Sequence, residues 1–147
     1  MSRRIERFKL LLKLAERKRK EAERLLGESQ QRVQQAEKGL QQLKAYQLEY
    51  QQQFTAAGRG GLTSGQLQTY QAFIAKVGGA ESQQHQALKQ SRVQLEQVEA
   101  YWRKTHAHYR AMQRLLEKAV DEKQRLDEKR LQQQLDERSQ HRPSAFI

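Results

Sequence analysis

An apolar repeat in the first third of the chain constrains the fold most strongly. Apolar residues recur at alternating spacings of four and three through residues 8–54, and no proline interrupts them. A mean period of about 3.5 residues is typical of a coiled coil, because such a stripe keeps facing a partner only if the helices supercoil. We therefore expect one helix over about residues 4–57. Its seam positions are Phe8, Leu12, Ala15, Arg19, Ala22, Leu26, Ser29, Val33, Ala36, Leu40, Leu43, Gln47, Tyr50 and Phe54.

The segment Thr55–Gly65 breaks this repeat and contains four glycines, which predict a turn over residues 58–65. Thr63, with Gln66 three residues later, predicts a capping box that starts a second helix over about residues 66–139. A flexible tail is expected over 141–147. The repeat resumes after the turn and lapses across Gly78 and Gly79. Its positions are Leu67, Tyr70, Ile74, Val77, Leu88, Ser91, Leu95, Val98, Trp102, Thr105, Tyr109, Met112, Leu116, Ala119, Lys123 and Leu126.

Two long helices with matching seams predict an all-α fold, a long two-helix antiparallel coiled-coil hairpin in a single domain over residues 1–140. A turn near Gly60 pairs residues whose numbers sum to about 121, and the second helix then overhangs the first by roughly 25 residues. The overhang would carry an unpartnered apolar stripe, which indicates a binding surface. A turn at Gly78–Gly79 is the alternative, with sums near 137 and no overhang. We favour the first register. The overhang residues are Leu116, Ala119, Leu126, Leu131 and Leu135.

Composition excludes several classes of protein. Hydrophobic residues make up 36% of the chain and cysteine is absent, so we expect neither a large globular core nor disulfides or thiolate sites. The longest aliphatic run, Leu10–Leu12, is far too short to span a membrane. His106 and His108 are two residues apart and point to different sides of a helix, which argues against a metal site. We expect no enzymatic activity, no cofactor and no metal.

The net charge of +11 is concentrated at the start of the chain, where residues 1–26 hold ten basic and four acidic side chains. Nucleic acid and an acidic protein cavity are both candidate partners for such a surface. Aromatic residues gather instead on both sides of the turn, and two of them, Tyr46 and Phe73, sit one position off the seam. Exposed tyrosines are efficient interface residues, so this end is predicted to dock a protein. The aromatic residues are Tyr46, Tyr50, Phe54, Tyr70 and Phe73.

Three segments carry a resemblance to a known family over essentially the whole chain. They are Arg4–Leu10 with Leu14–Glu16, Leu43–Tyr50, and Leu67–Ile74, the last two separated by the glycine-rich turn. In the order and spacing of their aromatic residues they resemble the FliJ family of the bacterial flagellar type III export apparatus. Alternatives are a basic structural or nucleic-acid-binding coiled coil, or the stalk protein of an injectisome.

The resemblance implies a non-enzymatic hairpin that couples the hexameric flagellar export ATPase to the export gate, a membrane protein whose cytoplasmic part it contacts. It also implies binding of flagellar export chaperones and no binding of nucleic acid. We expect a monomer in the cytoplasm, peripheral at the cytoplasmic face of the inner membrane.

The resemblance also implies two sets of binding residues. The family's gate-contacting patch maps to Leu43, Tyr46, Tyr50, Phe73, Val77 and Ala80. Its next position is commonly histidine and is Gln84 in this chain. The end with both termini is expected to enter the ATPase pore through Arg4, Arg7, Phe8, Leu11, Arg17, Leu116 and Leu126.

Overall fold

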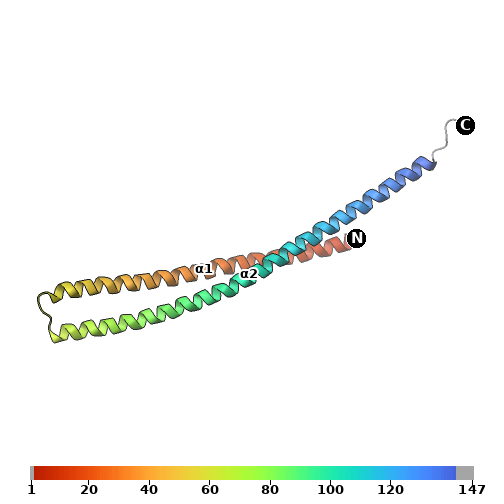
Figure 1. Ribbon diagram of the computed structural model, residues 1–147. Helices are drawn as coiled ribbons and strands as arrows, with labels where there is room; N and C mark the ends of the chain where they lie inside the picture. Colours follow the sequence, from red (N-terminus) through yellow and green to blue (C-terminus); the bar gives the residue numbers. More distant parts are fainter. Residues whose placement is uncertain (1, 142–147) are drawn as a thin grey trace. The chain divides into compact units, whose positions relative to one another are not determined.

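The chain folds into two long helices joined by one short turn. The computed structural model describes residues 2–141, with side chains for residues 2–140. Helix α1 spans Ser2–Gly58 and helix α2 spans Ser64–His141, and the described residues contain no strand (Figure 1). The predicted all-α hairpin is therefore confirmed. The expected flexible tail lies outside the described residues, apart from His141, which ends α2.

The two helices form two compact units. The turn unit comprises residues 22–102, which include the turn, and the terminal unit comprises residues 1–21 and 103–147. Each unit contains one segment of α1 and one segment of α2. The assignment of residues 1–140 to a single domain stays a prediction.

Local hydrogen bonds explain where α1 ends and α2 begins. Gly61 N donates to Gly58 O at 3.1 Å, and Gly61 has a φ of +91°, a conformation that side chains with a Cβ rarely adopt. At the start of α2, Gln66 N donates to Thr63 Oγ1 at 3.1 Å, and Thr63 N donates to Gln66 Oε1 at 3.0 Å. This reciprocal pair is the predicted capping box, which is confirmed.

In the turn unit the two helices pack antiparallel along the predicted seam. Its core is a cluster of Val33, Ala36, Leu40 and Leu88, with Leu95 packed against it. Where a residue of α1 contacts a residue of α2, the two residue numbers add up to a value from 119 to 129. The lowest sum is that of Tyr46 with Phe73, and the highest is that of Glu37 with Arg92. Gly78 and Gly79 lie inside α2, so the alternative turn at that point is not formed.

In the terminal unit a narrower seam joins the start of α1 to the later part of α2. Ile5 and Ala15 of α1 are buried, as are Thr105 and Ala119 of α2. Arg19, one of the polar seam positions, lies with its guanidinium carbon 4.7 Å from the centre of the Tyr109 ring. A cation above an aromatic face is attracted by the ring quadrupole, so this charge is accommodated within the seam.

Three details of the predicted seam are wrong. It does not lapse after Val77, because the half-buried Glu81 and Gln84 carry it on to the buried Leu88 at spacings of four, three and four. Leu67 is exposed, and Phe54 of the facing helix stacks its ring on Tyr70 instead. Leu126 is exposed as well, because it lies about level with Ser2, where α1 begins, and little of α1 covers it.

The overhang of α2 begins later than predicted. Leu116 is half-buried and Ala119 is buried, whereas every residue of 124–140 is exposed. In the terminal unit, Arg19 and Tyr109 pair with numbers that sum to 128, so the start of α1 reaches further along α2 than a sum of 121 allows. Figure 1 shows this last part of α2 running on past the start of α1.

Candidate protein-docking surfaces

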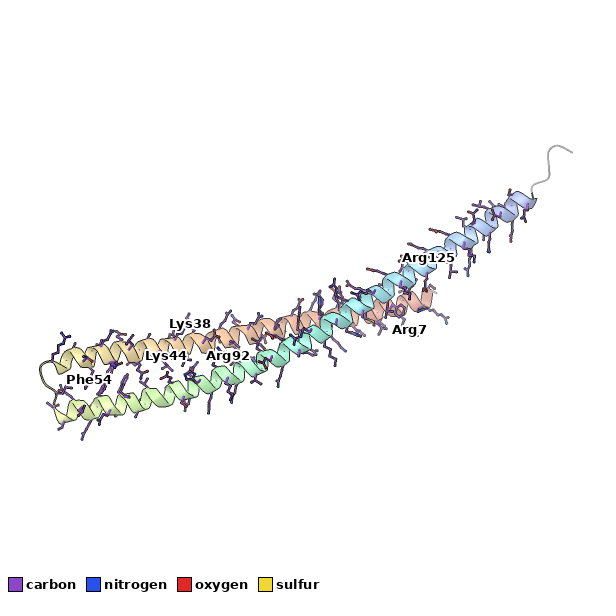
Figure 2. All side chains as sticks on the ribbon, viewed as in Figure 1. Arg7, Lys38, Lys44, Phe54, Arg92 and Arg125 are labelled. Atoms are coloured by element: carbon purple, nitrogen blue, oxygen red, sulfur yellow. The ribbon has the colours of Figure 1, made fainter. Side chains whose placement is uncertain are left out.

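The turn unit carries an aromatic cluster formed by both helices next to the turn, where Figure 2 labels Phe54. Tyr46 meets Phe73 edge-on, with 5.5 Å between ring centres. The centres of the Tyr50 and Phe73 rings lie 3.8 Å apart, and Phe54 stacks on Tyr70 at 3.6 Å. The cluster consists of Tyr46, Tyr50, Phe54, Tyr70 and Phe73, and its rings interlock across the two helices.

The residues of the expected gate-contacting patch differ in exposure. Tyr46 is 53% exposed, and its ring covers the edge of Phe73, so the two form a surface feature. Val77, by contrast, is only 6% exposed and belongs to the seam, so it supports the patch by packing. The half-buried members are Leu43, Tyr50, Phe73 and Ala80.

An open cleft of about 630 Å³ continues the aromatic cluster toward the turn. Tyr50 and Phe54 of α1 line it together with Leu62 of the turn. The remaining lining residues are uncharged, so an apolar side chain could enter this cleft without burying a charge. They are Gln53, Ala57, Thr63, Gly65, Gln66 and Thr69.

A half-buried polar contact lies at the other border of the patch. Gln84 Nε2 donates to the backbone carbonyl oxygen of Ala36 on the facing helix at 3.0 Å. Gly39 makes room for this side chain, because a Cβ at that position would lie 2.7 Å from Gln84 Nε2. The sequence alone does not show which side chain fills the space beside Gly39.

This contact predicts a specific double-mutant cycle. Gly39→Ala alone should leave the free energy of unfolding nearly unchanged, because a helix-propensity gain of about 1 kcal/mol is offset by loss of a hydrogen bond of about 1 kcal/mol. In a Gln84→Ala background the same change should stabilise the protein by about 1 kcal/mol. Urea unfolding followed by circular dichroism measures both values.

Gly27 provides the matched control, since a Cβ there would meet nothing within 4 Å. Gly27→Ala should stabilise by about 1 kcal/mol in both backgrounds. If Gly39→Ala behaves like Gly27→Ala in the wild-type background, Gln84 does not depend on the space at Gly39.

The residues expected to bind the ATPase all lie in the terminal unit. Phe8 is half-buried, and the guanidinium carbon of Arg4 lies 5.4 Å from its ring centre. Leu116 is half-buried in the seam, so Phe8 and Leu116 are less accessible to a partner than the rest of the set. The exposed members are Arg4, Arg7, Leu11, Arg17 and Leu126.

The described residues contain no metal-binding cluster and no membrane-spanning stretch. No group of three or more histidine, cysteine or carboxylate residues within them could hold a metal ion. Neither α1 nor α2, over the part of the chain that the structure describes, contains a stretch apolar and long enough to cross a bilayer.

Comparison with known proteins identifies the family. The model of the family described as "Flagellar FliJ protein" matches residues 4–145. The curated flagellar FliJ protein of Escherichia coli (strain K12) is 34% identical to this chain over 122 residues, which cover 80% of this chain and 83% of that protein. The chain belongs to the FliJ family.

Membership in the FliJ family makes this chain a component of flagellar protein export. It therefore favours the predicted export protein over a basic nucleic-acid-binding coiled coil. The family match covers nearly all of α1 and α2, so the aromatic cluster and the exposed end of α2 both lie within it.

Proposed function

We propose that this chain, a FliJ-family protein, couples the flagellar export ATPase to the export gate and handles export chaperones, without enzymatic activity of its own. The aromatic cluster with the exposed Tyr46 is the observation that carries the proposal. The protein would act as a monomer, peripheral at the cytoplasmic face of the inner membrane.

The aromatic cluster has the properties of a gate-docking surface. Tyrosine and phenylalanine supply large contact areas at low cost in conformational entropy, which is why aromatic residues dominate binding hot spots. Here Phe73 is held by Tyr50 and Tyr46 from the facing helix, so the surface is organised before a partner arrives. The cleft beside Leu62 extends the surface by an uncharged hollow.

The terminal unit has different properties, which suit an ATPase ring. Its first helical segment is strongly basic, and α2 continues beyond α1 as a single exposed helix. The exposed helix would enter the pore first, followed by the paired segment, in which α1 carries the basic side chains. Basic side chains would then meet acidic groups of the pore wall.

The test is a double substitution in the aromatic cluster. Tyr46→Ala with Phe73→Ala should weaken binding to the isolated cytoplasmic domain of the gate protein at least about 30-fold, the effect of removing one strong hot spot. Isothermal titration calorimetry with the purified proteins measures the affinity. Cells that carry the variant should lose export and swimming.

The matched control is Tyr101→Ala, which removes an exposed tyrosine of the turn unit outside the cluster. Its gate affinity should stay within about twofold of wild type. Circular dichroism should show unchanged helicity in both variants. Wild-type gate binding by the folded double variant would refute the proposed role of the aromatic cluster.

A further inference from the structure

The terminal unit presents a second stripe on α1, on the face opposite the seam. Arg3, Arg7, Leu10, Leu14 and Arg17 follow one another at spacings of four, three, four and three, so they share one helical face. We call these five residues the outer stripe. Leu10 is 61% exposed and Leu14 is 47% exposed, although both lie on a helix whose other face is packed against α2. Leucines at such positions contribute nothing to the seam.

The ion pairs of the described residues do not include the arginines of the outer stripe. Along this part of α1, Lys9 forms an ion pair with Glu6, and Lys20 forms one with Glu16. In the described part of the chain, Arg3, Arg7 and Arg17 form no ion pair. Lys13 beside the stripe is likewise exposed and without an ion pair among the described residues.

We propose that the outer stripe binds the surface of an anionic phospholipid bilayer, with Leu10 and Leu14 inserted at the boundary between headgroups and acyl chains. This inference rests on the peripheral localisation proposed above and names the membrane contact. Arg7 and Arg17 also belong to the set expected to bind the ATPase, so the bilayer contact concerns the protein when it is not bound to the ATPase. Exposed leucines flanked by arginine and lysine on one helix are the features that interfacial helices use, because apolar insertion and attraction to anionic lipid act together.

A bilayer fits the outer stripe better than a partner helix does. A coiled-coil partner needs an apolar stripe sustained over three to four heptads, whereas here the two leucines occupy a single turn between arginines. A bilayer needs only a shallow apolar wedge, and the long arginine side chains can reach the phosphates on both sides of it. Leu11 lies at the border of the stripe and is also exposed, which widens the wedge.

The experiment uses the purified full-length chain and vesicles that contain no protein. Co-sedimentation with vesicles of about one-third phosphatidylglycerol in phosphatidylcholine, at about 0.1 M salt, should show binding that pure phosphatidylcholine does not support. Arg3→Gln with Arg7→Gln and Arg17→Gln should weaken binding about 100-fold, the effect of three charges at an anionic leaflet. Leu10→Gln with Leu14→Gln should weaken it about tenfold.

The matched control removes the same charge from the turn unit, by Lys38→Gln with Lys44→Gln and Lys76→Gln. Figure 2 labels Lys38 and Lys44 on α1 and Arg7 near its start. All three lysines are exposed, and the control should change vesicle binding by no more than about threefold.

Equal losses in the two triple variants would overturn the proposal, because binding would then follow net charge alone. Absence of vesicle binding by the wild-type chain would overturn it too, and loss of ATPase binding by the arginine variant would then assign the outer stripe to a protein. Gate binding is measured without lipid, so a failure of the vesicle experiment leaves the proposed coupling function standing. A failure of the gate-binding experiment likewise leaves the membrane contact of the outer stripe standing.

Discussion

Leu88→Ala is expected to lower the free energy of unfolding by about 2–3 kcal/mol. Leu88 is 6% exposed and packs from α2 into the cluster of Val33, Ala36 and Leu40 on α1. Two helices offer few atoms that could relax into the space left behind, so the lost contacts are not replaced. The loss would be a large part of the 5–15 kcal/mol by which domains are stable. Urea unfolding followed by far-ultraviolet circular dichroism measures the difference.

Leu48→Ala is the matched control, since Leu48 is 56% exposed on α1 in the same unit. It should change the free energy of unfolding by less than about 0.5 kcal/mol. Equal effects of the two substitutions would mean that the seam around Leu88 does not hold the helices together.

The apolar repeat predicted the helical hairpin because a coiled coil repeats the same spacing of four and three residues along its whole length. Each seam position proposed for residues 8–54 is buried or half-buried in the structure. The turn was equally predictable, since the capping box needs only Thr63 and Gln66, which are three residues apart. These features depend on local spacing, so one sequence is enough to find them.

The polar part of the seam could not be predicted in the same way. Glu81 and Gln84 stand at seam spacing, but a polar residue there carries no hydrophobic signal. Gln84 is accommodated because Gly39 faces it and because Ala36 offers a carbonyl oxygen at 3.0 Å. Both conditions depend on residues more than forty positions away, whose register is set only when the helices pair.

The candidate docking site was predictable in outline only. Resemblance placed Tyr46 and Phe73 in one patch, and the structure brings their rings to 5.5 Å. The same resemblance included Val77, which the structure buries in the seam. Residue type alone could not separate these roles, because an apolar side chain near a seam serves either packing or binding according to its angle on the helix.

The exposed end of α2 is the second part of the chain whose removal is expected to have a large effect, in this case on ATPase binding. Residues 124–140 pack against no other helix in the described structure, and their leucines are exposed. Leu126 continues the seam beyond the start of α1, whereas Leu131 and Leu135 lie one turn apart on another face. Isolated helices of this length are marginal in water, so this segment is helical because it propagates from the paired part of α2.

A chain that ends at Lys123 is therefore expected to have nearly the same free energy of unfolding as the full chain. The difference should stay within about 0.5 kcal/mol, the usual effect of a surface change. It should nevertheless lose binding to the export ATPase by at least about 100-fold, the loss expected when several anchoring leucines are removed together. Urea unfolding and a pull-down with the purified ATPase measure the two quantities on the same preparation.

A substitution variant separates the leucines from the helix that carries them. Leu126→Gln with Leu131→Gln and Leu135→Gln should match the truncation in ATPase binding, because glutamine preserves helix propensity while removing the apolar surface. Gln132→Ala with Gln133→Ala and Gln134→Ala is the matched control, since it leaves all three leucines in place and should bind as the wild type does. If the leucine variant binds normally while the truncated chain does not, the contact is made by the charged residues of the segment. Normal binding by the truncated chain itself would move the ATPase contact to the part of the terminal unit where the two helices are paired.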